Sequence, residues 1–282
     1  MKIENIYDSW GSCIELTLDE LLSKDRLFWQ DLILSRNLLV LKGLGPDISD
    51  EEFFNLSFKF GKVWTNDIYT LPYISRGKDT TVSVDTSHPI SYFKSDNNGF
   101  SSRMMAYHAD MAHVKEYSWP GRALYMVNNT TDKSGATTWL NLELGWAQCS
   151  DEEKKLYDGY EVVMQDMYKP ETRMEKFPFI KINPKTGKLS PLVNCATVKQ
   201  GNCAWIHHIE RNGVPLSFID SNKIINELYQ LMESKPNTMY THFWDTGDML
   251  VYDNWFNVHS RTPVNDAASN GGRLLKRTTF NF

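Results

Sequence analysis

The chain lacks the features that carry a protein into or across a membrane. Among its 282 residues, the most apolar early stretch, Leu32 to Leu44, is broken by charged and polar side chains and is too short to span a bilayer. The first residues, Met1 to Asn5, include charges and lack the apolar core of a secretory signal. We therefore expect no membrane partner and a cytoplasmic location.

Cysteine is scarce, and long basic runs are missing. The 4 cysteines show neither Cys-x-x-Cys spacing nor the density of a disulfide scaffold, which favours buried free thiols. The formal net charge is −5, and no cluster of lysine and arginine forms the kind of basic face that follows phosphates. We therefore expect a reducing compartment and no nucleic-acid partner.

No flexible linker, charge block, internal repeat or low-complexity tract divides the chain. Hydrophobic residues make up 41% and aromatic residues 13%, which is enough for a large core and an aromatic-lined cavity. We expect a single domain over residues 1–282. A homo-oligomer is compatible with this composition.

Helical patterns are few, and short β-rich segments follow one another from about residue 80. A capping box that begins at Thr17 predicts a helix ending near Arg36. A second box at Ser49 predicts a helix that stops at Gly61. Further helices are expected over 151–157 and 220–234, and strands over 38–41, 81–84, 122–127, 136–140, 177–182, 189–193, 239–244, 249–252 and 274–280. This order predicts a mainly β fold with flanking helices, a sandwich or barrel of the jelly-roll type.

Two histidines and one aspartate are candidates for a metal site. His108 and Asp110 are two positions apart, so a strand would place both side chains on one face. Far downstream, a Gly247-Asp248 turn and a predicted strand precede His259 and would return it to the same cavity. Arg273 begins the next strand, where its guanidinium could pair with a carboxylate through two hydrogen bonds. Two imidazoles and a carboxylate can occupy one face of an octahedral Fe(II) and leave the other face open, as in an oxidase of small molecules.

Further motifs occur in a fixed order along nearly the whole chain. They are Leu38 to Gly43 with the following helix that closes in Phe60-Gly61, Tyr107-His108-Ala109-Asp110, the turn Ser134 to Trp139, the hairpin from Phe177 to Asn194, Gly247-Asp248, Asp253-Asn254 before His259, and Gly272 to Thr278. Together they resemble the TauD/TfdA (taurine dioxygenase) family of Fe(II)- and 2-oxoglutarate-dependent oxygenases. Three positions depart from the family pattern: Tyr107 replaces a tryptophan, Ala136 an aspartate and Gly272 an arginine.

The resemblance implies a double-stranded β-helix, or jelly roll, and a role for each matching residue. His108, Asp110 and His259 would be the catalytic Fe(II) ligands. Arg273 would bind the distal carboxylate of the co-substrate 2-oxoglutarate with help from the Thr137 hydroxyl, and O2 would be the oxidant. Because Asp110 is a carboxylate where related halogenases carry a small residue, halogenation is disfavoured.

The resemblance also implies a substrate class. Arg277, the second arginine of the closing motif, would contact the substrate, and Arg103 and His113 beside the first metal motif are further candidates. The substrate would be a small carboxylated, amino-acid-derived molecule of secondary metabolism, which the enzyme hydroxylates or desaturates. Enzymes that oxidise isocyanide derivatives of tyrosine are similar in size and layout.

Other interpretations stay open on the residues alone. A site with three protein ligands could hold the zinc of a hydrolase, although no separate motif supplies the general base which that chemistry needs. A β-sandwich that binds a ligand without turnover is a further alternative. His207 and His208 could form a lid or contact the substrate, although a solvated loop is the favoured interpretation. Asp248 and Asp253 are expected in turns or behind the ligands.

Overall fold

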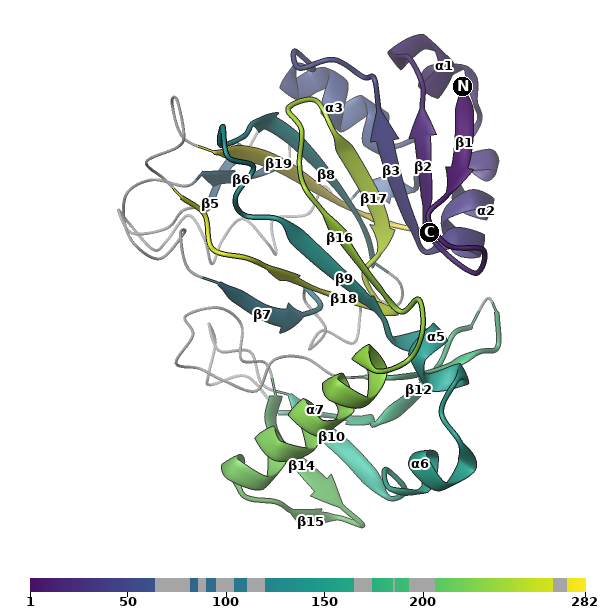
Figure 1. Cartoon of the computed structure of the whole chain (residues 1–282), viewed down its shortest axis with the longest axis vertical. Coiled ribbons are helices and arrows are strands. Elements are labelled where there is room, and N and C mark those ends of the chain that lie inside the picture. Colours follow the sequence, from purple (N-terminus) through teal and green to yellow (C-terminus); the bar gives the residue numbers. More distant parts are fainter. Residues whose placement is uncertain are drawn as a thin grey trace.

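A large sheet forms the frame of the molecule (Figure 1). The structure, a computed structural model, describes residues 1–63, 82–85, 90–94, 104–110, 120–164, 174–184, 186–192, 206–265 and 273–282. Within them the sheet runs in the order β1 (Lys2–Asn5), β2 (Ser12–Glu15), β3 (Leu38–Lys42), β17 (Met249–Asp253), β8 (Pro120–Asn128), β19 (Leu274–Asn281), β6 (Ile90–Lys94) and β5 (Val82–Asp85), with β4 (Lys62–Val63) paired to β19. Neighbouring strands are antiparallel except β2 and β3, which are parallel.

A second, four-stranded sheet packs against the first. It runs in the order β16 (Met239–His242), β9 (Thr137–Asn141), β18 (Asn257–Arg261) and β7 (Met105–His108), all antiparallel. Leu250 and Tyr252 of β17 share a buried cluster with Trp139 of β9, so the two sheets enclose a common core. This mainly β, two-sheet arrangement confirms the fold class predicted from the strand pattern.

Three helices cover the outer face of the large sheet (Figure 1). They are α1 (Leu18–Ser23), α2 (Arg26–Arg36) and α3 (Asp50–Ser57). Trp29 of α2 and Phe53 of α3 pack there in one cluster with Met249 and Val251 of β17. Because successive strand residues face opposite sides, β17 is buried on both faces and lies at the centre of the fold. In the described part of the chain, no helix has the length and apolar character needed to cross a membrane.

The single helix predicted from Thr17 to near Arg36 is wrong, because the chain forms two helices there. Lys24 is extended, with φ −86° and ψ 145°, and ends α1. The Asp25 carboxylate then accepts a hydrogen bond of 2.8 Å from the N–H of Phe28, which gives α2 its own cap. The helical spacing of apolar residues continues across this break, so the sequence pattern does not indicate that one helix ends and another begins.

A smaller group of elements, in the lower half of Figure 1, is inserted between β9 and β16. It comprises a sheet in the order β11 (Glu175–Pro178), β10 (Tyr160–Met164), β14 (Ile206–Arg211) and β15 (Val214–Pro215), the hairpin β12 (Ile180–Ile182) and β13 (Leu189–Pro191), and α5 (Leu142–Ala147), α6 (Asp151–Lys155) and α7 (Phe218–Glu233). The pairing of β12 with β13 confirms the predicted hairpin. The loop expected at His207 and His208 is wrong, because both residues belong to β14.

Candidate metal centre

The three residues predicted to form a metal site lie together. One ligand atom from each of His108, Asp110 and His259 can be chosen so that all lie within 4.8 Å of one another. Strands β7 and β18 pair with His108 directly opposite His259, and the two ring centroids are 4.2 Å apart. Two imidazole nitrogens and one carboxylate oxygen at this spacing could hold one divalent metal ion.

Asp110 reaches this group from a turn and not from a strand. β7 ends at His108, so Asp110 does not share a strand face with His108 as expected. Hydrogen bonds from another turn hold Asp110 in place instead. The buried side chain of Asn254, in the turn between β17 and β18, accepts from the Asp110 N–H at 3.1 Å. The same side chain donates to the Asp110 carbonyl at 2.7 Å. The turn that leads to His259 thus also fixes the main chain of Asp110.

Two arginines surround the Asp110 carboxylate. Arg277 of β19 places Nη1 2.7 Å from Oδ2, and Arg122 of β8 places Nε 3.5 Å from the same oxygen. Burial alone would raise the pKa of Asp110, but the charges of Arg277 and Arg122 outweigh it and hold this pKa well below its usual range. The carboxylate is therefore ionised at neutral pH.

Both imidazoles are buried and neutral at neutral pH. Burial lowers the pKa of His108 and of His259, and the proximity of His108 lowers that of His259 further. The His108 Nδ1–H donates to the Ala106 carbonyl at 2.8 Å, which leaves Nε2 as the atom with a lone pair for a metal. The buried Nδ1 of His259 has no hydrogen-bond partner within the described ranges. Neutral imidazoles and an ionised carboxylate are the protonation states that metal binding requires.

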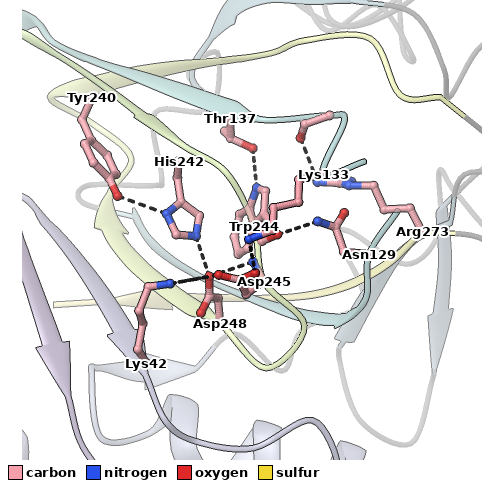
Figure 2. A network of polar contacts seen from close by, with 11 residues as sticks. Lys42, Asn129, Lys133, Thr137, Tyr240, His242, Trp244, Asp245, Asp248 and Arg273 are labelled. Carbon is pink, nitrogen blue, oxygen red and sulfur yellow. Dashed lines mark hydrogen bonds and ion pairs between the residues drawn. The ribbon is translucent and has the colours of Figure 1, made fainter. Parts of the chain in front are cut away.

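Arg273 contacts the chain at Gly135, two positions before Thr137 at the start of β9 (Figure 2). Thr137 and Arg273 are both buried, with exposed fractions of 5% and 3%. Arg273 Nη2 donates to the Gly135 carbonyl at 3.2 Å, and the Thr137 hydroxyl accepts from the indole N–H of Trp244 at 2.9 Å. Burial, aided by the charge of Arg261, lowers the pKa of Arg273 to about 9, so the guanidinium keeps its charge at neutral pH.

The remaining predicted site residues fall into two groups. Arg277 lies beside the candidate metal ligands, as described above, whereas Arg103 and His113 lie outside the described residues. Asp248 follows the Gly247 turn, and its carboxylate accepts from the main-chain N–H of Asp245. Asp253 is not in a turn but is the last residue of β17, and its carboxylate accepts from the N–H groups of Trp255 and Phe256 in the turn that follows.

Sequence reasoning missed Arg122 and the role of Asn254. Arg122 is the first residue of a segment whose pattern predicts a buried strand. A fully buried arginine requires an anionic partner, so an arginine in such a segment indicates a nearby carboxylate. Asn254 belongs to the Asp-Asn element already noted, but its contact with Asp110 joins segments 144 positions apart and depends on the folded chain.

Comparisons with known proteins give the same fold and one family. The model of the "Taurine catabolism dioxygenase TauD, TfdA family" matches residues 4–279. A taurine dioxygenase structure from Burkholderia xenovorans superposes with a TM-score of 0.69 at 17% identity, covering 99% of this chain and 89% of that chain. AAD-2 in complex with Mn(II) and N-oxalylglycine gives 0.69 at 14% identity, with 99% and 96% covered.

PvcB, described as an Fe, alpha-ketoglutarate dependent oxygenase from an isonitrile synthetic pathway, gives a TM-score of 0.69 at 14% identity, with 99% and 91% covered. By sequence, no curated protein matches. The structural relatives carry the predicted double-stranded β-helix, and the family match extends over nearly the whole chain. This chain therefore belongs to the TauD/TfdA family of Fe(II)- and 2-oxoglutarate-dependent dioxygenases.

Proposed function

We propose that this enzyme hydroxylates or desaturates a small carboxylated, amino-acid-derived metabolite, with His108, Asp110 and His259 as its Fe(II) ligands. The observation that carries the proposal is the convergence of their ligand atoms within 4.8 Å, on two buried histidines and a mostly buried aspartate in the protonation states that a metal needs. Bound iron and 2-oxoglutarate together would supply the activation of O2. In this proposal the three ligand residues hold the iron, and the protein supplies further side chains that hold the keto acid.

Arg273 and Thr137 are proposed to hold the distal carboxylate of 2-oxoglutarate. Both side chains are buried, Arg273 contacts Gly135 two positions before Thr137, and a guanidinium and a hydroxyl can each donate to an oxygen of one carboxylate. Since burial weakens the charged form of Arg273, an incoming carboxylate would restore the interactions that burial removes.

Arg277 is proposed to contact an anionic group of the primary substrate. The Arg277 side chain is 13% exposed, whereas that of Arg122 is 1% exposed. Two guanidinium groups near one carboxylate leave excess positive charge beside the metal site, which favours a negatively charged substrate. Arg103 and His113 stay proposals as further substrate contacts.

Within this substrate class, we propose an isocyanide derivative of tyrosine that belongs to secondary metabolism. It is compatible with the fold shared with PvcB, but at 14% identity that likeness supports the fold alone. We also keep a single domain over residues 1–282, a cytoplasmic location and a homo-oligomer as proposals. The family model, which covers residues 4–279, supports the first of these.

Succinate formation from 2-oxoglutarate tests the proposed function. Purified protein with Fe(II), 2-oxoglutarate and a panel of amino acids and their isocyanide derivatives is expected to release succinate with at least one of them. Asp110→Ala is expected to reduce this release to background, because it removes a metal ligand. Asp158→Ala, at an exposed position after α6, is the matched control and should keep full activity. Equal inactivity of the wild type and Asp110→Ala across the panel would contradict the proposal.

A further inference from the structure

Trp244 connects the proposed co-substrate site to an extended polar network (Figure 2). It lies just after β16 and is 1% exposed. Its indole N–H, which can only donate, gives its hydrogen to Thr137 Oγ1 at 2.9 Å. Thr137 is therefore the acceptor in this bond.

This bond determines what the Thr137 hydroxyl can do next. A hydroxyl carries one hydrogen and two lone pairs, and the indole occupies one lone pair. The hydroxyl hydrogen must then point away from Trp244, and within the described residues no side chain or carbonyl accepts it. A buried O–H in this state is a ready donor, and a carboxylate oxygen is the strongest acceptor class for it.

Contacts on its other sides keep Trp244 in place. The Asn129 side-chain amide donates to the Trp244 carbonyl at 2.6 Å, and the His242 ring packs edge-on with its centroid 4.9 Å from that of the indole. His242 accepts from the Tyr240 hydroxyl at 3.1 Å and donates to Asp248 at 2.9 Å. All these groups come from the chain itself, so the indole N–H occupies one lone pair of the Thr137 hydroxyl before any ligand binds.

We propose that Trp244 is a positioning residue that orients the Thr137 hydroxyl toward the distal carboxylate of the keto acid. This inference rests on the proposed function, in which Thr137 and Arg273 receive that carboxylate. Trp244 does not touch the co-substrate and acts only through Thr137.

Two metal-chelating anions test this role on the full chain loaded with Mn(II). N-oxalylglycine has a distal carboxylate, and oxalate lacks one. Calorimetric titration of Trp244→Phe is expected to show a dissociation constant for N-oxalylglycine about three- to tenfold higher than in wild type, the range that one net hydrogen bond gives. Oxalate affinity should stay within about twofold, because oxalate has no distal carboxylate to accept from Thr137. A loss of general stability or of metal would instead weaken the binding of both anions.

The chain supplies a matched control in Trp139. It is also fully buried, and its indole N–H has no hydrogen-bond partner among the described residues. Trp139→Phe makes the same chemical change and should leave the ratio of the two affinities unchanged. Thr137→Val should weaken N-oxalylglycine binding, and adding Trp244→Phe to it should have no further effect, since the two residues act in series.

The outcomes separate the inference from the proposed function. Wild-type protein that binds oxalate but not N-oxalylglycine contradicts the assignment of Thr137 and Arg273, and the inference with it. If the wild type binds both anions, the inference is overturned when Trp244→Phe leaves the affinity ratio unchanged, when Trp139→Phe shifts it equally, or when the Trp244 and Thr137 effects add.

Discussion

Asp110 shows how the chain keeps a mostly buried carboxylate charged. Arg277 and Arg122 supply opposite charge, and burial keeps His108 and His259 neutral. All three side chains are thus already in their metal-binding forms at neutral pH. Metal uptake near pH 7 should release few protons from them.

Replacing Asn254 tests how strongly the proposed metal ligand Asp110 depends on its main-chain contacts. Asn254→Asp keeps the size of the side chain but loses the donor to the Asp110 carbonyl and brings a second negative charge near the site. We expect about a 10- to 100-fold weaker affinity for Mn(II), the range seen when groups behind metal ligands are changed. Titration of the metal-free protein with Mn(II) measures it.

Asn257 is the matched position for this experiment. It lies in the same region and is buried, and its amide donates to the carbonyls of Asn37 and Asp253 but not to Asp110. Asn257→Asp should lower the melting temperature and leave the Mn(II) affinity of the folded protein nearly unchanged. Equal losses of affinity in both variants would show that Asn254 matters only for stability.

At the scale of elements, local signals in the sequence located strands and helix starts but not their partners. The capping residues Ser49 and Ser150 begin α3 and α6 as predicted. By contrast, α5 (Leu142–Ala147) was missed: its cap Asn141 also ends β9, and two elements that share one residue leave no gap in the pattern. The β1 strand was missed because all its side chains are exposed, which removes the alternation that marks a strand.

Gly247, in the turn between β16 and β17, is required by close backbone contact. Its φ is +91°, and a Cβ there would lie 2.8 Å from the carbonyl oxygen of Gly45. Gly247→Ala is expected to lower the free energy of unfolding by about 2–4 kcal/mol, from left-handed backbone strain together with overpacking. Urea denaturation measures the change.

Gly213 separates these two causes. Its φ is +77°, but a Cβ would meet no atom within 4 Å. Gly213→Ala should therefore carry only the backbone cost of about 1–2 kcal/mol. If both variants lose the same free energy, the contact with Gly45 contributes nothing.

For the whole molecule, the sequence predicted the class of fold and selected three residues whose possible ligand atoms lie together. Both leave regular local traces: short strands in series, and ligand types in a fixed order. The arginine pair around Asp110 depends on β8 and β19 lying side by side, and no local pattern reports that pairing. The same holds for the contact of Trp244 with Thr137, which joins residues 107 positions apart.

The buried histidines predict how stability changes with pH in the metal-free protein. Because their pKa values are lowered in the folded state, the unfolded chain binds more protons below its own histidine pKa near 6.5, so stability falls as pH falls. The expected slope from pH 6 to 5 is up to about 1.4 kcal/mol per pH unit for each histidine. Urea denaturation at pH 7, 6 and 5 measures it.

A double variant checks the origin of that slope. His108→Gln with His259→Gln should flatten it, whereas His207→Gln, at an exposed position on β14, should keep it. An unchanged slope in the double variant would assign the pH dependence to other groups.

The hydrogen bonds of Asn254 to a distant segment have a consequence for how the proposed metal ion would bind. His108 and His259 face each other through paired strands, and Asp110 is tied to the turn that precedes His259, so all three donors are assembled by the polypeptide itself. These three side chains would therefore lose little conformational entropy on binding a cation. Selectivity among divalent ions should then follow the chemistry of the donors and not any refolding of the chain.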